Sequence, residues 1–442
     1  MAGPSSVAES LQPSGMPEHD LTKVEGLHSY INACVPGYES CNVQRLDGGT
    51  ANHVYRMELA FGVGTIFKHA TDQLASDPSH TLDASRMDFE AGFLERLLDE
   101  ERLASPSDDS RPCCAMQGYA RVQIKQTHTH PVAFKSYHKH RKLLNLEDGG
   151  PINLKDAYSK LSRDDIEEIG TELGTWLANF HENTDKTHVT SAMPGHSNNT
   201  TGIAVCRHSY ENLPDVVVAQ GHDPSVARLI NEEVGSLFKS DDECVCHGDF
   251  WPGNILLRSA MSDQGPFTLT VIDWEMVRIG SSTTDVGQFA AEAFLLDSFR
   301  GEKGLHAAFM NAYAAARTSI QIDHAWLLGV AVHFAVHLAF WPARKVHWTR
   351  EEDTLKITSI GTSALRMLED IVYISPNPSS WSVFRFPETW NVKEYVEWLR
   401  KSNRRDIRKR IRSKRFGKKR KDSKLFVETE ETDGNSSDEA PD

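Results

Sequence analysis

The sequence contains few cysteines and no long uninterrupted hydrophobic run. Seven cysteines are scattered over 442 residues, an odd number that does not suggest a disulfide framework and indicates a reducing compartment, the cytosol or the nucleus. Residues 1–20 carry no basic stretch followed by an apolar segment, so we expect no secretory signal there. The longest apolar run, residues 326–341, is too short to span a bilayer and contains two histidines, which predicts a buried helix.

Positive charge is scarce except in one segment near the C-terminus. The net charge is −14, but residues 400–424 carry +13 and residues 425–442 carry −7, which leaves −20 on the other 399 residues. An acidic body argues against nucleic-acid binding by the body itself. The basic segment leaves three alternatives open: an import-receptor signal, contact with a polyanion such as RNA or anionic lipid, or a solvated extension.

Hydrophobic patterning changes along the chain from strand-like to helical. It predicts strands near residues 43–46, 53–59, 65–68, 119–126, 132–137 and 143–147, and a helix over 85–100. From residue 163 onward it predicts helices over 166–180, 224–239, 284–299, 303–318, 323–341 and 353–374, with a polar loop at 193–202. A strand-rich part followed by a helical part predicts an α+β fold with two lobes and a cleft between them.

The most specific motif occupies residues 247–254, which read His-Gly-Asp-Phe-Trp-Pro-Gly-Asn. Asp249 and Asn254 stand at the Asp-x-x-x-x-Asn spacing of a kinase catalytic loop, and Asp273 follows in an apolar, strand-like run. Phosphoryl transfer needs a carboxylate that orients the attacking hydroxyl, and oxygen ligands for the metal on the triphosphate. We therefore predict Asp249 as the base, Asn254 and Asp273 as Mg²⁺ ligands, and His247 as the residue that braces this catalytic loop.

Glu275, two residues after Asp273, has two readings that the sequence leaves equally open. It is either a further metal carboxylate or a salt-bridge partner at the end of the strand.

These segments resemble the aminoglycoside phosphotransferase / choline kinase-like family, and especially fungal-type proteins with an aminoglycoside phosphotransferase domain. The Gly-Asp-Phe-Trp-x-Gly-Asn loop at 248–254 and the Ile-Asp-Trp-Glu segment at 272–275 carry the resemblance, which extends over residues 40–370. It implies a two-lobed protein-kinase-like fold with a small antiparallel-sheet N-lobe and a mainly helical C-lobe. It also implies an ATP- and Mg²⁺-dependent phosphotransferase that acts on a hydroxyl of a small molecule.

The same resemblance implies a nucleotide loop and a hinge. Gly48, Gly49 and Asn52 fall in a segment that resembles the family's nucleotide loop, where glycine lets the backbone approach phosphate. Leu146 and Glu147 lie in the segment that resembles the inter-lobe hinge, whose backbone would hold adenine.

Three further charged residues receive roles from the resemblance. Lys68 stands where the family places the lysine that contacts the α- and β-phosphates, and Glu90 would be its ion-pair partner, with Glu95 as the second candidate. Asp285 resembles an aspartate at a helix start that supports the catalytic loop from behind.

We expect five segments along the chain. They are a disordered N-terminus (1–20), an N-lobe (21–147), a C-lobe (148–375), a C-terminal extension (376–399) and a basic, then acidic, disordered tail (400–442). Substrate contacts are expected within 185–240 and 300–350. Two alternatives to an active kinase stay open: a nucleotide-binding pseudokinase or scaffold, and a nucleic-acid-associated protein that acts through the tail.

Overall fold

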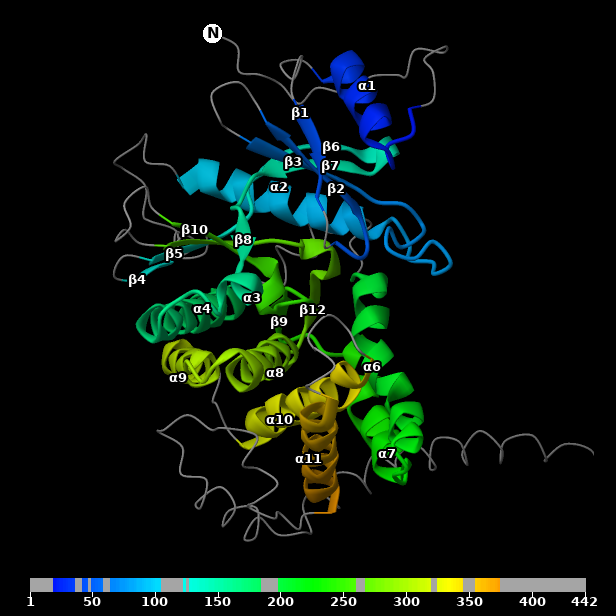
Figure 1. The fold of residues 1–442 in the computed structure, drawn as a ribbon, viewed down its shortest axis with the longest axis vertical. Coiled ribbons are helices and arrows are strands. Elements are labelled where there is room, and N and C mark those ends of the chain that lie inside the picture. The colour runs from blue at the N-terminus through cyan, green and yellow to red at the C-terminus, as the bar shows by residue number, and fades with distance from the viewer. Residues whose placement is uncertain are drawn as a thin grey trace, which may run out of the picture.

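The structure, a computed structural model, joins a strand-rich region to a mainly helical one (Figure 1). It describes residues 19–35, 42–46, 49–58, 64–104, 122–124, 127–183, 198–259, 267–318, 324–344 and 354–373. Gly48 and the basic and acidic tail lie outside these described residues. Within them, the predicted α+β architecture with a small antiparallel sheet and a mostly helical remainder is confirmed.

Five antiparallel strands form the sheet of the first region. In spatial order they are β1 (Asn42–Arg45), β2 (His53–Glu58), β3 (Gly64–His69), β7 (Leu143–Glu147) and β6 (Phe134–His138). Tyr55 and Met57 alternate inward on β2 and are fully buried against Leu27 and Ile31 of α1 (Val24–Cys34). The hydrophobic pattern predicts these strands but not α1.

The helix α2 (Arg86–Ala104) lies between this sheet and the helical region (Figure 1). Its buried apolar side chains include Met87, Phe93 and Leu94. The ring of Phe93 packs 4.9 Å from that of Trp274, centroid to centroid. This contact ties α2 to the segment that contains Asp273, and it brings the polar side chains of the same helix face toward that segment.

Residues 122–124 and 127–131 join a second sheet, and not the sheet formed by the strands that precede and follow them in the chain. The second sheet has the order β4 (Val122–Ile124), β5 (Thr127–Pro131), β11 (Phe267–Val271), β10 (Ile255–Ser259) and β8 (Ile152–Asn153). Strand β5 runs parallel to β11, with Thr129 opposite Leu269. The expected strand at 119–126 covers β4, but β5 falls between the two expected strands, where a turn is expected. Local alternation contains no information about a pairing partner so distant in sequence.

Helices form most of the second region. They are α3 (Leu154–Ala157), α4 (Arg163–Asn183), α6 (Thr200–Ala219), α7 (Ser225–Glu233), α8 (Ser282–Arg300), α9 (Leu305–Ala316), α10 (His324–Phe340) and α11 (Thr354–Tyr373). A short antiparallel pair, β9 (Cys244–Cys246) with β12 (Arg278–Gly280), lies among them.

The apolar run predicted as a buried helix is α10. Its side chains belong to the main hydrophobic core. Residues Trp326–Arg344 are long and apolar enough to cross a membrane by length and composition alone, and 72% of that window is buried inside the protein.

The hydrophobic pattern does not predict α6. The polar loop expected at 193–202 gives way to helix at Thr200, where Asn199 caps the first turn by accepting a hydrogen bond from the Gly202 amide (2.9 Å). Pro214 lies inside this helix, and a proline there normally argues against a helix.

Helices α4 and α9 approach closely at Gly174. A Cβ added there would lie 2.3 Å from the Phe309 carbonyl oxygen, so Gly174→Ala should force the helices apart and lower stability by about 1–3 kcal/mol. Gly361→Ala, in the interior of α11 with no atom closer than 3.8 Å, is the matched control and should stabilise by ~0.5–1 kcal/mol. Chemical denaturation of both variants measures the difference, and equal midpoints would contradict this account of the α4–α9 contact.

Candidate active site

Strands β10 and β11 bring the catalytic loop and the Asp273 segment side by side. Asn254 immediately precedes β10, and the backbone amide of Ile272 donates to its carbonyl oxygen (3.0 Å). Ile255 is paired with Val271 across the ladder. Asp273 then leaves the strand in a left-handed conformation, with φ 68°, which turns the chain into the short 3₁₀ helix Trp274–Met276.

Asp249 is half-buried and each of its carboxylate oxygens accepts a hydrogen bond. Gln288 of α8 donates to Oδ1 (2.6 Å) and the side-chain amide of Asn254 donates to Oδ2 (3.1 Å). The Asn254 amide also donates to the Asp249 carbonyl (2.9 Å). Sequence reasoning missed Gln288, although its place three residues after Asp285 on the same helix was a usable signal.

His247 is fully buried and both of its ring nitrogens are bonded. Nε2 lies 3.0 Å from the Ile272 carbonyl, and Nδ1 accepts the Asp249 amide (3.2 Å). Burial lowers the pKa of His247 to about 4, so the ring is neutral near pH 7. This geometry matches the predicted brace for the loop.

Asp285 holds the catalytic loop from behind, as predicted. Its carboxylate accepts the backbone amides of His247 (2.6 Å) and Gly248 (3.0 Å), and it lies 3.2 Å from Nε2 of His181 on α4. Burial alone would raise the pKa of Asp285, but the hydrogen bond and charge of His181 lower it. The carboxylate is therefore an anion that anchors two consecutive amides.

The ammonium of Lys68 lies in a cluster of three carboxylates. It donates to Glu90 (2.7 Å) and to Asp273, and it lies 3.7 Å from Glu275. Burial alone would lower the pKa of Lys68, but the three carboxylates more than offset this and raise it. The predicted partner Glu90 is therefore the one that the structure brings to Lys68, whereas Glu95 is exposed.

Glu275 is buried and its Oε2 atom accepts two hydrogen bonds from the first region. Asn52 donates to it (2.6 Å), and so does Nε of Arg86 (3.1 Å). Of the two readings that the sequence left open for Glu275, this geometry favours the ion pair. Sequence reasoning missed Arg86, which is fully buried on the first turn of α2.

The remaining predicted residues lie along the first sheet. Asn52 ends the β1–β2 connection, Gly49 is exposed there, and Gly48 falls outside the described residues. Leu146 and Glu147 end β7, where the Leu146 carbonyl accepts from Thr65 (2.8 Å) and the Glu147 amide donates to Ala133 (3.0 Å). Their roles toward a nucleotide stay predictions.

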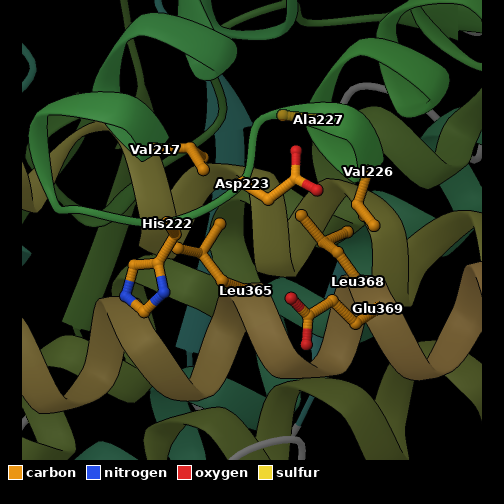
Figure 2. A pocket seen from close by; sticks show the side chains of 8 residues that line it. All are labelled: Val217, His222, Asp223, Val226, Ala227, Leu365, Leu368 and Glu369. Atoms are coloured by element: carbon orange, nitrogen blue, oxygen red, sulfur yellow. The ribbon is translucent and has the colours of Figure 1, made fainter.

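A small pocket lies elsewhere, between the α6–α7 connection and α11 (Figure 2). Val217, Leu365 and Leu368 line it, together with the polar side chains of His222 and Glu369. None of its lining residues belongs to the charge cluster around Lys68 or to the catalytic loop. We therefore place the chemistry at those two features and not in this pocket.

Comparison with known proteins identifies a domain and two curated relatives. Residues 139–326 match the phosphotransferase enzyme family, APH. The 4-hydroxytryptamine kinase of Psilocybe cubensis is 23% identical over 362 residues, which cover 78% of this chain and 92% of that protein. The 4-hydroxytryptamine kinase of Psilocybe cyanescens is also 23% identical, with the same shares covered.

Among solved structures, similar chains include an aminoglycoside 2'-phosphotransferase-IIIa in complex with GDP (TM-score 0.45, 16% identity, covering 79% of this chain and 98% of that one). Choline kinase LicA from Streptococcus pneumoniae gives a TM-score of 0.42 at 15% identity, covering 78% and 99%. Asp249, Asn254 and Asp273 all fall within the matched range of the family. The match to the phosphotransferase enzyme family thus spans the catalytic loop and the metal motif, whereas Lys68 and Glu90 precede the matched range.

Proposed function

We propose that this protein transfers the γ-phosphoryl group of ATP to a hydroxyl of a small molecule with the help of Mg²⁺. Small-molecule phosphotransfer is the activity that the family domain and both kinase relatives support. The observation that carries the proposal of ATP, Mg²⁺ and a hydroxyl acceptor is the pairing of the buried Lys68 with Asp273 beside the Asp249–Asn254 loop. A lysine for phosphates, a metal carboxylate and a base are the parts that phosphoryl transfer needs.

The donor set fits Mg²⁺, which prefers oxygen ligands. Asp273 is 33% exposed, so part of its carboxylate faces solvent although Lys68 contacts it. Asn254 turns its amide nitrogen to Asp249, which leaves the side-chain oxygen as its ligand atom. Glu90, Asp273 and Glu275 offer oxygens within 4.8 Å of one another, and the Lys68 ammonium contacts all three. The side chains of Glu90 and Glu275 are only 0% and 4% exposed, so Asp273 is the one of these three carboxylates that an ion from solvent can reach. We therefore assign Asn254 and Asp273 as the metal ligands, and the bound ion would neutralise charge on the triphosphate.

The protein groups would act by positioning and by charge. Lys68, held by Glu90, would pair with the phosphates and stabilise the negative charge that develops during transfer. Asp249 would accept a hydrogen bond from the acceptor hydroxyl and take its proton as the phosphoryl group arrives. Gln288 and Asn254 fix the Asp249 carboxylate in one orientation, which keeps the hydroxyl aligned for attack.

We further propose that the acceptor is a hydroxylated amine. Both curated relatives are named for a hydroxylated tryptamine. The net charge of −20 on residues 1–399 suits a cationic acceptor. The pseudokinase and tail-centred alternatives are not favoured, because the described catalytic-loop and metal-motif residues are all present and adjacent.

Purified protein should phosphorylate at least one hydroxylated amine in a panel that contains 4-hydroxytryptamine, ethanolamine, choline and an aminoglycoside. Phosphorus NMR of the product would show a phosphomonoester that forms only with ATP and Mg²⁺. Asp249→Asn should lower turnover by about 10²–10⁴-fold, the range expected for losing a general base. Asp223→Asn, at an exposed loop aspartate, is the control, and equal losses in both variants would contradict the assignment of Asp249.

The rate should rise with pH through about 7. Burial and the negative charge of Asp273 raise the pKa of Asp249 to about 7, while the hydrogen bonds from Gln288 and Asn254 oppose the shift. The carboxylate is the active form, so kcat/KM should fall as the pH drops below that value. Gln288→Leu removes a donor to the anion and should move the acid limb to higher pH.

Gln220→Leu, at the C-terminal end of α6, is the matched control for the pH profile and should leave the limb in place. Two results would show that ionisation of Asp249 does not set the acid limb of the kcat/KM profile. One is an acid limb near the pKa of an unperturbed aspartate, and the other is an acid limb that Gln288→Leu does not move.

A further inference from the structure

Arg86 uses all three of its guanidinium nitrogens to join three separate segments. Nε donates to Glu275 (3.1 Å), and Nη2 donates to the Ala51 carbonyl (3.1 Å) and to the Asn52 side chain (2.9 Å). Nη1 donates to the carbonyls of Leu82 (2.7 Å), Asp83 (2.9 Å) and Thr71 (3.2 Å). The side chain is fully buried, so these protein groups, and not water, satisfy it.

Glu90 lies one helical turn after Arg86 and contacts the same segment, Asp273–Glu275. Residues four apart on a helix share a face. Arg86 holds Glu275, while Glu90 accepts the backbone amide of Trp274 (3.2 Å) and binds Lys68. The helix α2 is therefore attached at two neighbouring points to the turn that starts at Asp273.

Arg86 also changes the charge balance around Lys68. With Arg86 present, two cations face the three carboxylates of Glu90, Asp273 and Glu275. Without Arg86, Lys68 would be the one cation facing all three among the described residues. The Lys68 ammonium is already 3.7 Å from Glu275, and an unpaired buried carboxylate would attract it more strongly. That attraction would draw Lys68 away from any phosphate.

We propose that Arg86 is a positioning residue for nucleotide binding, a role that rests on the proposed kinase function. It holds Glu275 as a paired anion, so that Lys68 stays directed to the phosphates and Asp273 stays in place for the metal. Through Ala51 and Asn52 it also fixes the end of the β1–β2 connection against the same turn. The nucleotide loop and the metal carboxylate are thereby set relative to each other by one side chain.

Calorimetric titration of the full chain with Mg²⁺-ATP tests this role. Arg86→Gln should raise the Kd about tenfold or more, as expected when a group is removed from a shared network. Arg317→Gln is the matched control, because Arg317 is also buried and paired with a carboxylate, Glu243 (3.1 Å), outside the site. Both variants should lose thermal stability, but only Arg86→Gln should lose affinity.

A second pair of variants separates positioning from folding. Glu275→Gln in the Arg86→Gln background should restore part of the affinity, because it removes the unpaired anion that competes for Lys68. Arg86→Lys keeps the positive charge but loses the planar guanidinium group that donates to several acceptors at once. This variant should therefore fold and still bind Mg²⁺-ATP more weakly than the wild type.

The outcomes distinguish this inference from the proposed function. Wild-type affinity in Arg86→Gln, or an equal loss in Arg317→Gln, would overturn the role of Arg86 alone. If Arg86→Gln raises the Kd for Mg²⁺-ATP by the same factor in the wild-type and in the Glu275→Gln background, the proposed coupling between Arg86 and Glu275 is overturned. Absence of Mg²⁺-ATP binding in the wild type would overturn both the inference and the kinase function.

Discussion

The arrangement of the site depends on the burial of one ammonium, that of Lys68. An unpaired cation in a protein interior costs several kcal/mol, so the fold must bring carboxylates to it. Glu90 comes from α2, and Asp273 and Glu275 come from the turn after β11. Satisfying Lys68 therefore requires the sheet, α2 and the metal-motif turn to meet at one place, and that meeting place is where a triphosphate would bind.

Aromatic packing and a second buried anion hold the other half of the site. Trp274 is fully buried and its ring lies 4.4 Å from that of His247 and 5.4 Å from that of Phe180 on α4, centroid to centroid. Asp285 fixes the amides of His247 and Gly248 at the start of α8. The catalytic loop is thus supported by a buried aromatic core on one side and remains half-buried at Asp249, a combination that suits a base that must meet a small acceptor.

Much of the site was predictable, because its chemistry depends on local spacing. The Asp249–Asn254 spacing and the position of Asp273 predicted the catalytic loop and the metal motif, whereas the pairing of Lys68 with Glu90 was implied by the resemblance to the family. The pairing of β5 with β11 was not predictable, because partners in a sheet are chosen by packing between distant segments. Arg86 was missed for the same reason, because it reads as an ordinary helix residue until the fold shows what it contacts. Gln288 was also missed, although its place three residues after Asp285 offered a signal.

The most direct test of the nucleotide–metal site is the melting temperature of the wild type and of Asp273→Asn, with and without Mg²⁺-ATP. A ligand that binds only the folded state stabilises it by about 2.7 kcal/mol at a concentration 100 times its Kd. We predict a Mg²⁺-dependent rise in the melting temperature of the wild type and of Asp223→Asn, and its loss in Asp273→Asn. No rise in the wild type at millimolar nucleotide, or an equal rise in Asp273→Asn, would contradict the account.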